Sequence, residues 1–214
     1  DAEVADILLH AELVSVPVMK THNKSTITGA IKNQFGCLGK VRHNYHPVLS
    51  RALVEINRLV RPRLAVMDAT VCLEGDAPKS GRPRVVGLVL ASNDIVALDA
   101  VQATMMGFDP TTIEHLNLAA QAGLGTNDLS RIRLVGEPLD EWRLQFEPAR
   151  DNLVSRVENR LRESRLRRIA FGGLFFRLCC WGALGFYLAW YYLGPGRHMC
   201  RQIVEHSPYG AQWR

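Results

Sequence analysis

The sequence predicts an α/β protein, with a mostly parallel sheet flanked by helices and a C-terminal tail of basic and hydrophobic helices. Through residues 1–147, short apolar runs alternate with longer segments that repeat their apolar residues every three or four positions. This alternation is typical of parallel sheets whose strands are joined by helices. The composition changes near residue 148, so we divide the chain into an α/β domain (1–147) and a tail (148–214). Hydrophobic residues at 47% and charged residues at 22% favour a folded globular protein.

The elements of the α/β domain are predicted by local signals. Apolar runs predict strands at 13–18, 63–69, 84–92 and 131–136. Apolar residues at helical spacing predict helices at 28–36, 47–60, 93–107 and 111–123. Thr28 is placed to cap the first of these helices, Asn93 or Asp94 suits the cap of the third, and Pro47 suits the first turn of the second.

The tail has a different charge from the domain. Residues 148–214 hold 11 arginines and 4 acidic residues, whereas residues 1–147 hold 15 basic and 17 acidic ones. A basic amphipathic helix is predicted before residue 169, followed by the hydrophobic helical segment 169–193. This segment is long enough to span a bilayer, but it could also lie in the membrane interface, or form a buried hairpin broken at Gly182 or Gly185. We expect a cytoplasmic protein attached to a membrane surface through 150–193, because arginines favour that side of a membrane.

Basic side chains gather in the stretch from Val16 to Lys40. Lys20 and His22 are two positions apart at the end of a predicted strand, so they share one face of the sheet. Lys32 follows in the first turns of the next predicted helix, whose free N–H groups also attract anions. These features predict a crevice that binds a small anion, with Asn33 beside it. The alternative is that the lysines are simply solvated and that His22 ends the strand.

Carboxylates follow two later segments of the domain. Asp68 ends a predicted strand and Glu74 lies in the next loop, where either could serve as a general base or cation ligand, or simply belong to a turn. Asp99 lies inside an apolar helix and could form an ion pair with a buried cation.

Metal, cluster and nucleic-acid sites are not indicated. Pro47 disfavours a helical conformation at His46, so His43 and His46 do not share one face of a helix as metal ligands would, and we predict no metal. The five cysteines lack C-x-x-C spacing, and their odd number favours free thiols in a reducing compartment, so the cofactor is left unknown. The arginine excess is confined to one tail, so we expect no nucleic acid as a partner.

Several segments follow one another in a recognisable order, among them "VPVMKTH", "ITGAIKNQFG", "LAVMDATVCLEG" and "LASNDIVALDAVQATMMGFDP". In this order they resemble the domain-of-unknown-function 362 family of bacteria and archaea, and the resemblance covers about residues 4–137. It implies an α/β fold without an assigned activity. Some members are iron–sulfur proteins, but their cysteine motifs are absent from this sequence. The family's first strand and helix are also absent, so we expect an N-terminally truncated chain. The positions that match its motifs are Lys20, Thr21, His22, Lys32, Asn33, Gly36, Asp68, Glu74 and Asp99.

Two functional hypotheses follow from these residues. In the first, the protein is an enzyme or redox accessory that acts on a small anionic substrate at the membrane. Lys20 and Lys32 then hold the negative charge, His22 moves protons near neutral pH, and Asp68 or Glu74 is the base. Thr21, Asn33, Gly36 and Asp99 complete the ligand site by resemblance. In the second, it is a non-catalytic, membrane-attached binding or scaffold protein with a degenerate pocket. The sequence leaves enzymatic activity undecided.

Overall fold

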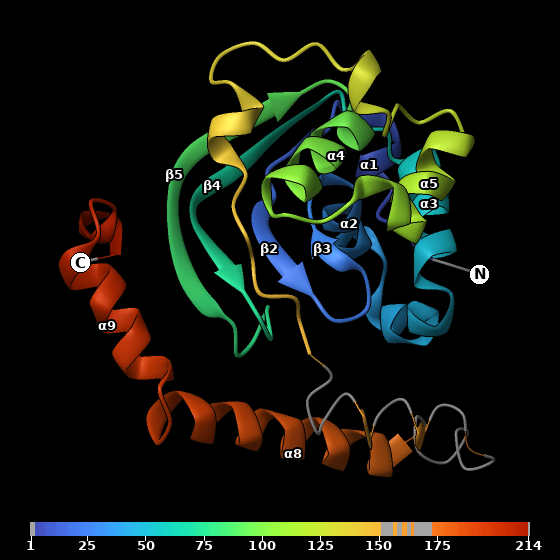
Figure 1. Ribbon diagram of the computed structural model, residues 1–214. Helices are drawn as coiled ribbons and strands as arrows, with labels where there is room; N and C mark the ends of the chain where they lie inside the picture. Colours follow the sequence, from blue (N-terminus) through green and yellow to red (C-terminus); the bar gives the residue numbers. More distant parts are fainter. Residues whose placement is uncertain (1–2, 151–155, 158–159, 162–163, 165–172, 214) are drawn as a thin grey trace.

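A mixed five-stranded sheet with helices packed on one face forms the body of the molecule (Figure 1). This computed structural model describes residues 3–150, 156–157, 160–161, 164 and 173–213. The strands are β1 (Val14–Ser15), β2 (Val18–His22), β3 (Thr26–Thr28), β4 (Leu64–Glu74) and β5 (Arg82–Ser92). The predicted α/β fold class is confirmed.

Strand β4 is the centre of the sheet. Its first residues pair in parallel with β1, at Val14 with Leu64, and β2 continues the parallel pairing at Val18 with Asp68. β5 pairs antiparallel with β4, from Ala65 with Ser92 to Glu74 with Arg82. β3 pairs antiparallel with β2. The run at 13–18 was predicted as one strand, but it belongs to two short ones, and Pro17, which has no N–H to donate, lies between them.

The helices cover one face of the sheet (Figure 1). Those of the domain are α1 (Ile7–His10), α2 (Ala30–Asn33), α3 (Leu49–Leu59), α4 (Ile95–Met105) and α5 (Glu114–Gln121). Short 3₁₀ helices connect them: η1 (Gln34–Cys37), η2 (Lys40–Val48), η3 (Pro110–Thr112), η4 (Leu129–Arg131) and η5 (Leu139–Trp142). Each residue of α4 is buried, and Asp94 caps it by accepting the N–H groups of Val96 and Ala97, as predicted.

The hydrophobic core lies between the sheet and these helices. Met19, Met67, Ile31, Leu53 and Leu116 are fully buried there and come from β2, β4, α2, α3 and α5. Phe146 is the last residue of this core along the chain. The opposite face of the sheet is more open, since Val89 on β5 is 63% exposed.

Two local predictions are wrong. Residues 131–136 form no strand: Arg131 ends η4, the residues after it pair with no strand, and Val135 is 85% exposed although Ile132 packs on the core. Thr28 ends β3 instead of capping α2, whose N-cap position is Gly29.

The C-terminal part contains α8 (Gly173–Tyr192), α9 (Gly196–His206) and the 3₁₀ helix η6 (Gly210–Trp213). α8 continues through Gly182 and Gly185, so the alternative of a hairpin broken at either glycine does not hold, and the turn comes at residues 193–195. The basic helix predicted before residue 169 falls largely outside the described residues, as does the start of segment 169–193. No helix in the described part of the chain combines the length and apolar character needed to cross a bilayer.

α8 and α9 lie at the outside of the sheet. Figure 1 shows α8 running past the end of the sheet where β2 and β4 finish, while α9 lies beside β5. Lys79, in the turn between β4 and β5, places its Nζ 4.6 Å from the ring centre of Tyr187 on α8.

Candidate anion-binding site

Two of the predicted basic residues, Lys20 and His22, lie in the last three residues of β2. Met19 and Thr21 are buried against the core, and alternation places Lys20 and His22 on the other face, where both are half-buried. Their backbones pair with Thr28 and Thr26 of β3. Burial lowers the pKa of Lys20 below its ordinary value.

The chain brings Lys32 back to the same region because β3 reverses direction beside β2 and leads directly into α2. Lys32 lies four residues after Thr28, the residue that pairs with Lys20. Burial, followed by repulsion from Lys20 and Arg42, lowers the pKa of Lys32 to about 8. The effect of Lys20 on Lys32 places the two lysines within electrostatic reach of one another.

His22 lies among several cations. Burial is the largest cause that lowers its pKa to about 3, and repulsion from Lys32, His46, Lys24 and Lys20 adds to it. The imidazole is therefore neutral near pH 7. Its Nδ1 accepts the backbone N–H of Lys24 at 3.1 Å, which leaves Nε2 as the N–H donor of the ring. His22 can thus donate a hydrogen bond, but carrying a proton near neutral pH requires a bound anion to raise its pKa.

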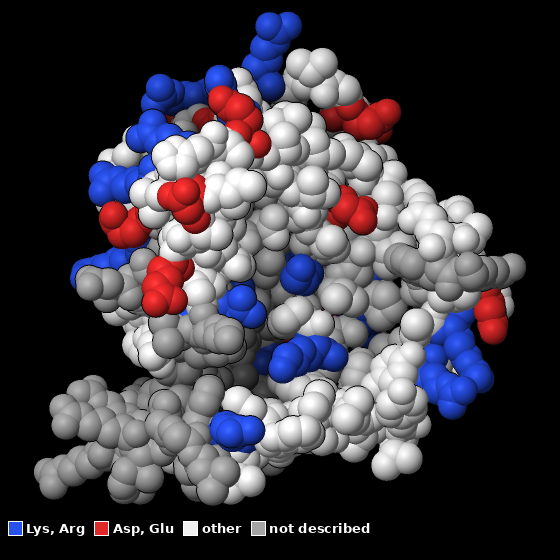
Figure 2. All heavy atoms as spheres, turned by 180° about the vertical axis from the view of Figure 1, so that it is seen from behind, with Lys and Arg blue, Asp and Glu red and all other residues white. Residues whose placement is uncertain are grey.

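No carboxylate contributes to the pKa shifts of Lys20, His22 or Lys32 within the described residues. Figure 2, which shows the molecule from behind, has Lys and Arg side chains bordering a hollowed part of the surface, with Asp and Glu nearer its rim. A half-buried group of cations without a carboxylate partner is the environment that an anionic ligand would neutralise.

Two further basic side chains reach this cluster from η2, and sequence spacing did not identify either as a site residue. Repulsion from Arg42 lowers the pKa of Lys32, and repulsion from His46 lowers the pKa of His22. The ring of Phe35 contacts both His46 and Lys32. It stacks on His46 with ring centres 5.8 Å apart, and its centre lies 5.7 Å from Lys32 Nζ. The only local signal was the histidine before Pro47.

His115 of α5 is a third residue that sequence reasoning missed. Its side chain is buried, and Nε2 has no hydrogen-bond partner among the described residues. Burial, followed by repulsion from Lys32, lowers the pKa of His115 to about 4. It therefore lies within electrostatic reach of the lysine cluster, on its inner side.

Asp99 has a different role from the one predicted. Its carboxylate oxygens accept the N–H groups of Ala30 at 2.6 Å and Ile31 at 2.9 Å, so it occupies the N-terminus of α2 that we had assigned to a ligand. Gly29 makes this contact possible, because a Cβ there would lie 2.2 Å from Asp99 Oδ1. Burial raises the pKa of Asp99 to about 7 against the lowering effect of these two hydrogen bonds.

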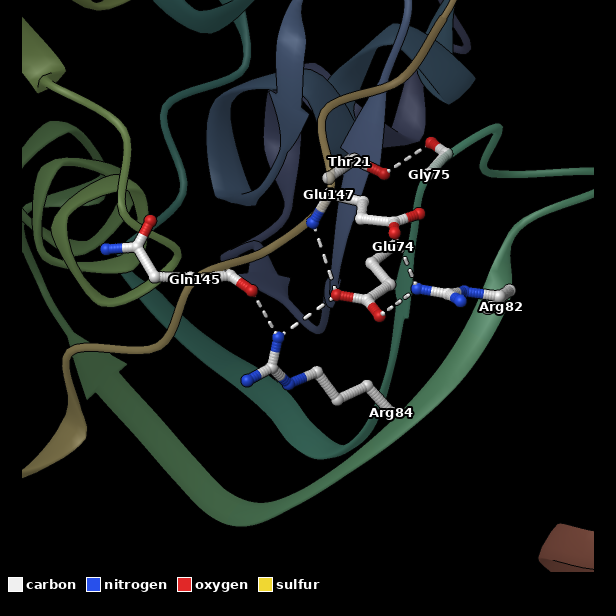
Figure 3. A network of polar contacts seen from close by, with 7 residues as sticks. All are labelled: Thr21, Glu74, Gly75, Arg82, Arg84, Gln145 and Glu147. Carbon is white, nitrogen blue, oxygen red and sulfur yellow. Dashed lines mark hydrogen bonds and ion pairs between the residues drawn. The ribbon is translucent and has the colours of Figure 1, made fainter.

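Glu74 lies in a separate polar network (Figure 3). Its carboxylate binds Arg82 at 3.1 Å and Arg84 at 3.0 Å, and it also accepts the backbone N–H of Glu147. Thr21 of β2 points toward the same network, where its hydroxyl donates to the carbonyl of Gly75 at 2.8 Å. Thr21 and Glu74 thus fasten the β4–β5 hairpin to β2 and to the chain at 145–147.

The remaining predicted residues lie beside the cluster or apart from it. Asp68 accepts both the N–H and the hydroxyl of Thr70. Asn33 is exposed, and its amide donates to the hydroxyl of Ser15. Gly36 is exposed, with open space where a Cβ would stand. No group of three or more His, Cys, Asp or Glu side chains suited to a metal ion occurs among the described residues, and all five cysteines are free thiols.

The fold and the site together define an α/β domain that carries a half-buried basic cluster at the end of a parallel strand pair. Residues 1–104 match the family described as "Domain of unknown function (DUF362)", and this range contains all nine predicted site residues. The chain is also 37% identical over 123 residues to the thylakoid-associated protein sll1697 of Synechocystis sp.. This match covers 54% of the chain but only 38% of that relative. No solved structure matches the chain.

Proposed function

We propose that the domain binds a small anion, of the phosphate or carboxylate class, between Lys20, His22 and Lys32, as an enzyme or redox accessory that acts on an anionic substrate. The observation that supports this proposal is the pair of half-buried lysines beside the neutral His22, in which Lys20 repels Lys32 and no carboxylate contributes to the pKa shift of either lysine. A bound anion would replace this repulsion with attraction, in a setting that is less screened than open water.

Each residue has a distinct part in the proposed complex. Lys20 and Lys32 supply positive charge, and the neutral His22 donates from Nε2. His115 lines the inner side, and its Nε2 is a polar atom still without a partner in the described residues. Asp68 and Glu74 are left out of the proposal, because each already accepts hydrogen bonds away from these cations. Asp99 contributes indirectly, by fixing the start of the helix that carries Lys32.

Calorimetric titration with inorganic phosphate tests this proposal. At about pH 7 we expect Lys32→Met to weaken binding about tenfold or more, as expected for a lost charge-assisted hydrogen bond. Arg133→Met removes an exposed arginine outside the cluster and should leave the affinity unchanged.

The pH dependence separates a specific role of Lys32 from a general loss of positive charge. A bound anion raises the pKa of Lys32 above its value of about 8 in the free protein. Wild-type affinity should therefore fall as pH rises beyond about 8, by up to about tenfold per pH unit, and Lys32→Met should lose most of this slope. Equal affinities of wild type and Lys32→Met at neutral pH would contradict the proposal.

A non-catalytic binding function is the second candidate. It is favoured by the low pKa of His22, which keeps the imidazole neutral near pH 7, and by the engagement of both predicted bases elsewhere. The two candidates differ in one readout: an enzyme should turn over an anionic substrate with a rate that depends on His22, whereas a binding protein should return its ligand unchanged.

We also propose that the protein acts at the cytoplasmic face of a membrane, attached through residues 150–193. Support comes from the arginine-rich composition of this region and from the relative that is named as thylakoid-associated. Fractionation of cells that express the natural full-length protein should place it with membranes, and high salt should release part of it if the arginines contribute.

A further inference from the structure

α8 presents different side chains on its two faces. On the side toward the body, Ala183, Tyr187 and Trp190 are half-buried at spacings of four and three residues. Tyr187 contacts Lys79 of the β4–β5 turn on this side. α8 thus contacts the hairpin through Tyr187, while Trp190 packs beside Gly196 at the start of α9.

The opposite face of α8 exposes large apolar and aromatic side chains. Leu178, Trp181, Leu188 and Tyr192 fall on one stripe of the helix. Trp181 is 67% exposed and Leu188 is 47% exposed, although such side chains are normally buried in a globular protein. Nothing in the described part of the chain covers this stripe.

The charges near α8 indicate what could cover it. The sequence from Ser164 to Val204 contains no Asp or Glu, while Arg177, Arg197 and Arg201 are all exposed. Apolar and aromatic side chains bordered by arginines match the boundary between the acyl chains and the anionic headgroups of a bilayer. A protein partner with an apolar groove would not by itself account for a segment of this length without any acidic residue.

We infer that α8 lies flat in the interface of an anionic bilayer, with the stripe of Leu178, Trp181, Leu188 and Tyr192 inserted and its opposite side attached to the domain. This inference rests on the membrane association proposed above and adds the occupant, the face and the orientation of the helix. Since α8 passes the end of the sheet where β2 and β4 finish, the domain approaches the bilayer with the end that carries the lysine cluster (Figure 1). A ligand at that cluster would then be taken up close to the headgroups.

Vesicle flotation of the full chain tests the inserted face. The vesicles are phosphatidylcholine alone, or phosphatidylcholine with about a third phosphatidylglycerol. We expect the wild type to float with the anionic vesicles, and Trp181→Gln with Leu188→Gln to reduce partitioning about tenfold or more. Val135→Gln removes an apolar residue that is 85% exposed outside α8, and should leave partitioning unchanged. Arg177→Gln with Arg201→Gln should reduce binding to the anionic vesicles only.

The orientation is tested by quenching tryptophan fluorescence with lipids brominated along their acyl chains. Wild type should be quenched, and Trp181→Phe should lose most of this quenching, whereas Trp142→Phe should retain it. Flotation without any effect of Trp181 or Leu188 would leave membrane association standing but overturn the inserted face. Failure of the wild type to float would overturn both. If instead the chain dimerises in solution and the same double variant abolishes the dimer, a second copy covers the stripe and the inference is wrong.

Discussion

At the scale of single residues, the site contrasts two solutions to burying charge. The carboxylate of Asp99 is fully buried, but two backbone N–H groups of α2 bind it directly. Lys20 and Lys32 are only half-buried, yet they have no carboxylate within electrostatic reach among the described residues. The first arrangement is complete within the protein and is therefore structural. The second lacks such partners within the described residues, which is why we propose an anionic ligand at the lysines.

Gly29→Ala should show how tightly the Asp99 contact is built. The added Cβ would lie 2.2 Å from Asp99 Oδ1 and 2.3 Å from Gln102 Oε1, so the carboxylate must move away from the start of α2. We expect a loss of about 2–4 kcal/mol in the free energy of unfolding, from overpacking and from weakened hydrogen bonds. Urea denaturation measures it. Gly36→Ala is the control, since nothing lies within 4 Å of its added Cβ, and it should change stability by less than about 0.5 kcal/mol.

At the scale of elements, local patterns predicted the two longest strands best, β4 and β5 with 11 residues each. β4 and β5 match the apolar runs at 63–69 and 84–92, but β4 extends to Glu74 because the pairing with β5 continues past an irregularity between Ala69 and Val71. Such an irregularity shifts the alternation on which a sequence prediction depends. β3 was not predicted, because it has only three residues and begins at Thr26 with a positive φ of 61°.

The residues of the candidate site were likewise predictable only where they lie close together in the sequence. Lys20, His22 and Lys32 could be grouped from sequence because they lie within 13 residues, on β2 and on α2, with only a turn and the short β3 between them. His46 and His115 could not, because η2 and α5 reach the cluster only through tertiary packing. Asp99 was recognised as unusual inside an apolar helix, but its partner depended on how α4 packs against α2.

The β4–β5 hairpin should depend on Glu74 for its attachment to the domain. The Glu74 side chain is 11% exposed and is shared by Arg82 and Arg84, so Glu74→Gln leaves two arginines without their common carboxylate. We expect a loss of about 1–3 kcal/mol in the free energy of unfolding, less than for a fully buried pair because both arginines are partly exposed. Glu12→Gln breaks an ion pair with Arg63 in which both side chains are at least 70% exposed, and should lower the free energy of unfolding much less than Glu74→Gln does. Equal effects of the two variants would show that the hairpin network contributes no more than a surface pair.

At the scale of the whole molecule, the buried titrating groups oppose one another as pH changes. Burial lowers the pKa of His22 to about 3 and of His115 to about 4, so both resist protonation that the unfolded chain accepts. Burial raises the pKa of Asp99 to about 7, so the folded state holds this proton more readily than the unfolded state does. Acidification therefore destabilises the fold through the histidines and stabilises it through Asp99. Measured on the wild type alone, the two effects partly cancel.

His115→Phe separates these contributions, because it removes one titrating group and keeps a ring of similar size in the buried position. In the wild type, the stability that depends on neutral His115 is fully present above the unfolded pKa of about 6.5 and is lost as pH falls toward about 4. Between about pH 7 and pH 4.5, the variant should therefore lose about 2–3 kcal/mol less unfolding free energy than the wild type. Urea denaturation of both proteins at the two pH values measures this difference, and any constant packing effect of phenylalanine cancels in the comparison. Parallel losses in the two proteins would mean that His115 is not held neutral, and the inner side of the lysine cluster would then be open to water rather than closed by this ring.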